Sequence, residues 1–553
     1  MAILLLIFME NFEGMLFLIN HLLSLLIWLP ILGGFFVLMV RPSSIDINNR
    51  AIASWIALFF SLLTIILSLV LYLNFDNTSF CLQFVEKRFW FDLFTINSFT
   101  YYHLGVDGFS VLFIILTSFT NLIIILSAWN SIKFRLRQYM AIFLITTGIT
   151  NALFCAQDTF LFYMFWESLL IPTTLGIGIW GGHNKSYAAM KYFLYTFSGS
   201  VFLLLAFIYV QHQVSLSRVL EPGTFSISNF IFWATEVDQM KNLVNITLTA
   251  QWFLFFAFFL AFAVKIPMWP FHSWLPDAHS EAPAGGSVIL AALMLKLGAY
   301  GFLRFVLPMV PSITAFLDWI LVIISLIGII YVGIIAISQN DFKRLIAYSS
   351  ISHMGLVTLG IFSIFLLIKY NPDNLSGIED AQIAIQGTVF QMITHAFSSG
   401  GMFIGCGYLY LRVKSRNITD FQGVAKSMPI FSTFFMLFCL ANIGLPGTSG
   451  FVGEFLIIFS VFKYSFWIAL LAGLTLIISP LYTLWMYKNI FFGKTISKNI
   501  ENLKDISGLE LLVFVLLSIP ILFFGFYPNA ILEISEESSK NIVYAAAHVL
   551  NIE

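Results

Sequence analysis

The chain has 553 residues, of which 59% are hydrophobic and only 10% are charged, and its formal net charge at pH 7 is −1. No soluble domain of this length can bury so much apolar surface, so the composition indicates a polytopic α-helical membrane protein. The charge balance gives no sign of a nucleic-acid partner. The four cysteines are far apart and the sequence lacks nucleotide-binding motifs, so we expect no cofactor and no metal in this chain.

Apolar runs of about 20 residues, the length that crosses a bilayer, follow one another along the chain. They predict about 14 transmembrane helices, and the run of the twelfth is long enough for a helix that is broken inside the membrane. The predicted spans are residues 21–40, 51–73, 106–129, 139–157, 159–181, 188–211, 249–271, 283–305, 313–338, 345–368, 383–411, 429–463, 465–490 and 509–527.

The basic residues between these spans predict the orientation of the chain. Loops after odd-numbered spans carry 17 lysines and arginines, whereas loops after even-numbered spans carry 7. Since basic loops stay in the cytoplasm, we expect both termini on the outer side of the membrane.

Few ionisable side chains remain inside the predicted spans. An unpaired ammonium group at mid-bilayer costs at least about 2.5–3.5 kcal/mol, so such residues suggest a pathway for ions or protons. The candidates are Glu167, Lys265, Lys296, His353, His395 and Glu454.

Two of these residues lie beside helix breaks. Lys265 in span 7 precedes Pro267 and Pro270, and Glu454 in span 12 follows the Gly-Leu-Pro-Gly segment at 444–447. Interrupted helices at matching places in two five-helix blocks are typical of transporters with inverted repeats. We therefore expect an all-α fold with two inverted five-helix repeats, broken at spans 7 and 12. The predicted units are residues 1–138 (spans 1–3), 139–305 (first repeat), 306–490 (second repeat) and 491–553 (a loop, span 14 and an outward tail).

Five stretches in and beside these spans are distinctive sequence motifs: AVKIPMWPFHSWLPDAHSEAP, YMFWESLLIP, DFKRLIAYSSISHMG, QMITHAFSSGGMFIGCG and LPGTSGFVGEF. Together they resemble the antiporter-like membrane subunits of respiratory complex I, over about residues 139–490. Three related subunits of this family differ in the twelfth helix. Glutamate at this place, as in Glu454, is typical of one of them, whereas its sisters and the sodium/proton antiporters usually have lysine.

The resemblance implies a role for each buried group. Glu167 and Lys265 match the charge pair of the first half-channel, and Lys296 matches the central relay. Glu454 matches the terminal site that opens to the outside, and the two histidines match residues that bridge the middle. The physics agrees with these roles, because a low dielectric weakens the hold of a lysine on its proton while a nearby carboxylate strengthens it.

The resemblance also implies the surroundings of the chain. We expect a bacterial inner (plasma) membrane, and as partners the lipid bilayer and the other membrane and peripheral subunits of complex I, sister antiporter-like subunits among them. Flavin, iron–sulfur clusters and quinone are expected in those partner subunits. The implied activity is proton translocation driven by quinone reduction.

Each candidate residue has a simpler explanation. Glu167 could satisfy backbone amides freed by Pro172, and the two lysines could extend to a surface. Glu454 could cap the second half of its helix, and the histidines could be packing residues. For the whole chain, the alternatives are a subunit of a multi-chain sodium/proton antiporter or membrane-bound hydrogenase, and a membrane scaffold that conducts nothing.

Other polar residues are expected to be structural. His272 and His279 flank a turn without metal-ligand spacing. Asp107 and Asp318 lie near helix starts, where carboxylates cap. The polar loop that contains Asp277 is expected to shape a channel mouth.

Overall fold

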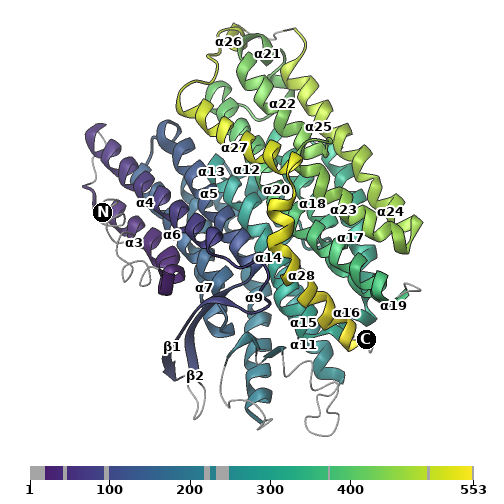
Figure 1. Ribbon diagram of the computed structural model, residues 1–553. Helices are drawn as coiled ribbons and strands as arrows, with labels where there is room; N and C mark the ends of the chain where they lie inside the picture. Colours follow the sequence, from purple (N-terminus) through teal and green to yellow (C-terminus); the bar gives the residue numbers. More distant parts are fainter. Residues whose placement is uncertain are drawn as a thin grey trace.

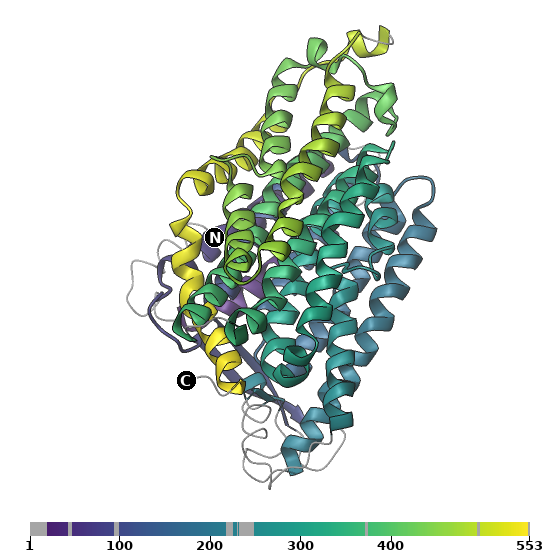
Figure 2. The same cartoon turned by 90° about the vertical axis from the view of Figure 1, so that its right-hand side faces the viewer.

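The helices of the chain run roughly side by side in one bundle, as seen in the computed structural model (Figures 1 and 2). The structure describes residues 19–41, 47–92, 99–216, 225–228, 230–231, 248–370, 374–494 and 498–550. The first part of the bundle is formed by α3 (Leu22–Met39), α4 (Ile47–Leu73), α5 (Gly108–Ser131), α6 (Leu136–Cys155), α7 (Thr159–Ser168), α8 (Leu170–Trp180) and α9 (Lys185–Leu216).

The middle part contains the two lysines and the most irregular helix. It consists of α11 (Leu248–Lys265), α12 (Trp274–Glu281), α13 (Ala284–Ile289), η1 (Leu290–Met294), α14 (Leu295–Gly301), η2 (Phe302–Val306), α15 (Leu307–Met309) and α16 (Pro311–Phe316). The elements from α13 to α15 follow one another without a break, so they form one membrane-length helix with two π-helical turns, η1 and η2.

The last part contains the histidines and Glu454. It consists of α17 (Asp318–Ile337), α18 (Phe342–Phe362), α19 (Ile364–Tyr370), α20 (Asn374–Val413), the 3-10 turn η3 (Ile418–Asp420), α21 (Val424–Ser427), α22 (Pro429–Ile443), α23 (Ser449–Tyr464), α24 (Phe466–Gly473), α25 (Thr475–Phe491), α26 (Lys498–Glu501), α27 (Leu509–Phe526) and α28 (Asn529–Val549).

Eleven helices in the described part of the chain are long and apolar enough to cross a membrane. They coincide with predicted spans 1–6, 8–10, 13 and 14. Predicted spans 7 and 12 are too short because they are broken, and α20, the expected span 11, carries many polar side chains. The polytopic helical fold is confirmed, and the number 14 stays a prediction.

Both predicted breaks are confirmed. After α11 ends at Lys265, Pro267 has no N–H to continue the helix, and the chain turns into the short α12. Helix α22 ends at Ile443, and the capping residue Gly444 has a φ of +78°, a left-handed conformation that glycine adopts without steric cost. Helix α23 begins only at Ser449.

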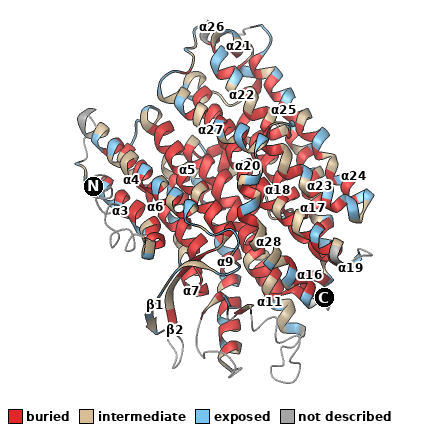
Figure 3. Ribbon diagram, in the orientation of Figure 1, coloured by how far each residue is buried: buried red, intermediate tan, exposed pale blue. Residues whose placement is uncertain are grey.

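The interior of the bundle lies around α18 and the helix of the π turns. In an apolar 18-residue segment of each of these two spans, 100% and 94% of the residues are buried inside the chain. Figure 3 shows this buried centre. Large apolar side chains at the periphery stay exposed, as Trp467 does with 70% of its surface, which suits contact with lipid.

The helical fold also contains a short β-hairpin, and the predicted tail forms a helix. Strands β1 (Gln83–Asp92) and β2 (Phe99–Val106) pair antiparallel between α4 and α5, in the segment between predicted spans 2 and 3, for which we made no strand prediction. The aromatic residues of the two strands favour β-structure. The search for apolar runs of about 20 residues, however, does not detect strands this short. The expected tail after span 14 forms α28, which packs on α5 and α20 along one flank of the bundle (Figure 2).

Candidate functional site

Lys265 is the first buried charge of the site, at the last turn of α11. Its side chain is only 1% exposed, and Nζ has no hydrogen-bond partner among the described residues. The ammonium lies 5.0 Å from the ring centre of Trp166 and 6.0 Å from that of Tyr192. Aromatic faces stabilise a cation only modestly, so Lys265 is a poorly compensated charge that does not extend to a surface.

Glu167, the predicted partner of Lys265, lies on α7 directly after Trp166. It is close enough for an electrostatic interaction with Lys265, but the two side chains form no ion pair in the described structure. Oε1 of Glu167 is buried, and no hydrogen-bond partner for it occurs in the described ranges, so this oxygen does not satisfy the amides freed by Pro172. The structure therefore brings the predicted pair near each other but not into contact.

Lys296 lies between the two π turns and is fully buried. The N–H of Leu295 bonds to the carbonyl of Leu290, five residues back, rather than to that of Ala291. The Ala291 carbonyl instead accepts a hydrogen bond of 2.6 Å from Nζ of Lys296. The wider π turn thus provides an acceptor for the ammonium, which agrees with the frequent occurrence of such turns at functional sites.

His395 on α20 is the second partner of Lys296, although the two are 99 positions apart. The distance between Lys296 Nζ and His395 Nδ1 is 2.9 Å, and both side chains are at most 3% exposed. A protonated lysine can therefore donate directly to a neutral histidine ring.

His353 on α18 and Glu454 on α23 form the next contact of the site. Nδ1 of His353 lies 2.9 Å from Oε1 of Glu454, and each side chain is 1% exposed. This is the distance of an ion pair, but the ring nitrogens of His353 are not aligned for a hydrogen bond with any described residue. The rings of His353 and His395 are 5.7 Å apart between centres. The two contacts thus form one buried row of Lys296, His395, His353 and Glu454.

The helix break brings Glu454 into this row. A Cβ atom on Gly450 would lie 2.1 Å from the Ala441 carbonyl, so only glycine lets α23 pass the end of α22. Glu454 follows Ser449, the first residue of α23, by five positions, whereas caps and dipole effects belong to the first turn. Glu454 therefore does not cap α23.

Two polar residues of the interior were not among our predicted site residues. Gln391 donates from Nε2 to Oε1 of Glu454 at 3.2 Å. His279, which we expected to be structural, is completely buried, and its ring stacks on Phe403 with 4.4 Å between centres. Since a glutamine carries no charge and His279 lies in a polar loop segment, neither stands out as an intramembrane charge in the sequence.

The end of the bundle at α12 carries ion pairs outside this row. Asp277 on α12 pairs with Lys191 at 2.7 Å and also with Arg344. Glu281 pairs with Arg416 at 3.3 Å. The loop that we expected to shape a channel mouth is thus attached to α9, α18 and the chain after α20.

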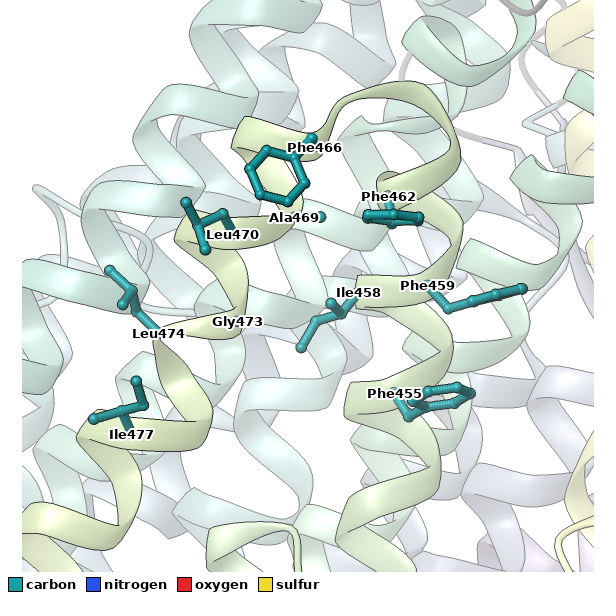
Figure 4. A pocket seen from close by; sticks show the side chains of 10 residues that line it. All are labelled: Phe455, Ile458, Phe459, Phe462, Phe466, Ala469, Leu470, Gly473, Leu474 and Ile477. Carbon is teal, nitrogen blue, oxygen red and sulfur yellow. The ribbon is translucent and has the colours of Figure 1, made fainter.

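At the two helix starts, Asp107 caps α5 by accepting the Ser110 N–H at 3.0 Å, as predicted. Asp318 lies in the first turn of α17 and pairs with Lys369 at 2.8 Å. An open groove of about 370 Å³ lies on the surface between α23 and the α24–α25 pair (Figure 4). Only apolar residues line it, so it does not belong to the buried row. They are Phe455, Ile458, Phe459, Phe462, Phe466, Ala469, Leu470, Gly473, Leu474 and Ile477.

A bundle with broken helices and a buried row of lysine, histidine and glutamate defines an antiporter-like membrane subunit. Residues 156–479 match the family described as NADH:quinone oxidoreductase/Mrp antiporter, TM. The chain therefore belongs to this family.

Similar proteins of known type indicate which subunit of this family the chain corresponds to. The chain is 39% identical to NADH-quinone oxidoreductase subunit M of Rhodobacter capsulatus, over 95% of this chain and 96% of that protein. It is also 39% identical to NADH-ubiquinone oxidoreductase chain 4 of Marchantia polymorpha, over 94% of this chain and 97% of that protein. Subunit M, or chain 4 in mitochondria, is the type that Glu454 predicted, and the prediction is confirmed.

Solved structures agree with the fold. A chain of respiratory complex I from Thermus thermophilus with bound NADH matches with a TM-score of 0.79 and 27% identity, over 96% of this chain and 99% of that chain. A chain of the membrane-bound sulfane sulfur reductase, an archaeal respiratory membrane complex, matches with a TM-score of 0.74 and 21% identity, over 91% of this chain and 76% of that chain. The second likeness concerns the fold alone.

Proposed function

We propose that this chain translocates protons as the M-type membrane subunit of NADH:quinone oxidoreductase, driven by quinone reduction in partner subunits. The observation that carries the proposal is the buried row, in which Lys296 lies 2.9 Å from His395 and His353 lies 2.9 Å from Glu454. Two close pairs of titratable groups in the interior of a bundle are costly for stability, and a proton path explains why they are there.

The row can pass protons in steps that each move one proton. The Lys296 ammonium donates to Nδ1 of His395, which leaves a neutral amine and an imidazolium. The imidazolium releases a proton from Nε2 toward His353, and a ring rotation or a water molecule bridges the distance between the rings. His353 then protonates Oε1 of Glu454, the terminal group. Lys265 recharges Lys296, and Glu167 stabilises the charged form of Lys265.

The remaining parts of the proposal concern the surroundings. This chain carries no redox centre, and flavin, iron–sulfur clusters and quinone belong to partner subunits. The chain crosses a bacterial inner membrane many times, with both termini on the periplasmic side. The excess of basic residues in one set of loops supports this orientation.

The test is Lys265→Ala in the assembled complex, with the exposed Lys133→Ala as the matched control. A tagged chain is purified in mild detergent, its partners are identified by mass spectrometry, and NADH:quinone turnover and proton pumping are measured after reconstitution. We expect flavin and iron–sulfur subunits with both variants, and coupled turnover only with Lys133→Ala. An assembled Lys265→Ala complex that pumps fully would indicate a scaffold. Co-purification of small antiporter subunits without NADH oxidation would indicate a sodium/proton antiporter.

A further inference from the structure

Gln391 lies at the junction of the buried row, one helical turn before His395 on α20. Its side chain is 2% exposed, and its amide Nε2 donates to Oε1 of Glu454 at 3.2 Å. One element thus carries both the acceptor of Lys296 and a donor to Glu454. Unlike the four side chains of the row, Gln391 carries no acid–base group.

The contacts divide the two oxygens of Glu454. Oε1 lies 2.9 Å from His353 and accepts from Gln391, whereas Oε2 has no hydrogen-bond partner in the described part of the chain. A carboxylate held by one oxygen cannot rotate freely about its last bond, so the amide fixes which oxygen faces His353. The other oxygen stays available for a further proton partner.

The backbone near Gln391 explains why the contact can form. A Cβ atom on Gly453 would lie 2.7 Å from the backbone nitrogen of Gln391 and 2.8 Å from its Cα. These are backbone atoms, which cannot rotate away as a side chain can. Only glycine at position 453 therefore lets α23 approach α20 closely enough to bring the neighbouring Glu454 within reach of the amide.

We propose that Gln391 is a positioning residue for proton transfer, which holds the Glu454 carboxylate in reach of His353. This inference rests on the proposed function and deepens it. An amide suits the task because it donates a hydrogen bond without gaining or losing a proton itself, so its bond to Glu454 persists while its neighbours change charge. A merely structural role would instead be to fill the space between α20 and α23.

The experiment separates the two roles with a side chain of similar size. Gln391→Met keeps the length and volume but lacks the amide donor, and Gln386→Met is the matched control. Gln386 lies on the same helix and bonds only weakly, at 3.4 Å, to the backbone carbonyl of Leu532 on α28. The whole complex is reconstituted in liposomes, and NADH turnover and proton uptake are measured for the single variants, for Glu454→Gln and for the double variant Gln391→Met/Glu454→Gln.

We expect Gln391→Met to lower proton-coupled turnover about tenfold, the factor for a hydrogen bond to a charged group, while Gln386→Met stays near the parent. In the Glu454→Gln background, Gln391→Met should add no further loss, because the amide acts through the carboxylate. Gln391→Asn, which keeps the amide on a shorter side chain, should recover part of the loss.

Two results would overturn the inference while leaving the proposed function intact. The first is that the Gln391→Met complex pumps protons as fully as the parent, although the Glu454→Gln complex no longer pumps. The second is a loss in the double variant equal to the product of the single losses. If Glu454→Gln itself pumps fully, the proposed role of Glu454 fails, and the inference fails with it. Gly453→Ala provides an independent check. It separates α20 from α23, so it should lower proton-coupled turnover as Gln391→Met does. Gly473→Ala, whose Cβ meets open space, is the control and should leave turnover unchanged.

Discussion

Replacement of Lys296 by methionine separates proton transfer from stability. Methionine has nearly the length of lysine and no charge, so the space in the bundle stays filled. His395 Nδ1 and the Ala291 carbonyl lose the donor that now lies 2.9 Å and 2.6 Å away. An unsatisfied buried acceptor costs about 1–3 kcal/mol. The loss of the buried charge acts in the opposite direction, because replacement of buried ion pairs by apolar side chains of similar volume is neutral or gains about 1–4 kcal/mol.

The two unsatisfied acceptors together cost about 2–6 kcal/mol, and removal of the buried charge offsets part of this cost, so the free energy of unfolding should fall by at most about 6 kcal/mol. Proton transfer, in contrast, needs the ammonium itself. We therefore expect a Lys296→Met complex that still assembles, with a loss of thermal stability within this bound, but whose coupled turnover falls at least about tenfold.

The assay compares NADH oxidation and proton uptake in proteoliposomes with thermal unfolding of the purified complex. Lys343→Met is the matched control, because Lys343 is also buried and donates to one backbone carbonyl, that of Ala282. Full pumping by an assembled Lys296→Met complex would refute the reasoning. A loss of pumping of equal size in both variants would show that buried charge in general, and not the row, is required.

Two further predictions concern packing and topology. Gly298→Ala would bring a Cβ atom to 2.6 Å from the backbone nitrogen of Ile266, so α11 and α14 must separate, and we expect a loss of about 1–3 kcal/mol in stability. Gly176→Ala, with no atom within 4 Å of its Cβ, is the control, and equal thermal stability of the two variants would contradict the close approach. Among the four cysteines, Cys81 is exposed and the other three are buried. A membrane-impermeant thiol reagent added outside intact spheroplasts should therefore label Cys81, and this labelling should disappear in Cys81→Ser. Labelling that requires access from the inside would reverse the proposed orientation.

The sequence by itself determined the class of protein, most membrane spans and the two breaks. These features depend on local chemistry, because a long apolar run must cross the bilayer and proline or a left-handed glycine must end a helix wherever it occurs. The candidate charges also stood out locally, since an ionisable side chain is costly in an apolar run. The hairpin of β1 and β2 was missed because its strands are shorter than a span, and α28 was missed because its 21 residues are too polar for one.

Only the tertiary structure decided which of these charges meet. Lys296 contacts His395 across 99 positions, and His353 reaches Glu454 from a different helix, because α18, α20 and α23 pack around the interior. The same packing keeps Glu167 out of direct contact with Lys265 and brings Gln391 to Glu454. Local sequence patterns carry no information about such distances, which follow from helix packing at glycines such as Gly453 and from the π turn that frees the Ala291 carbonyl.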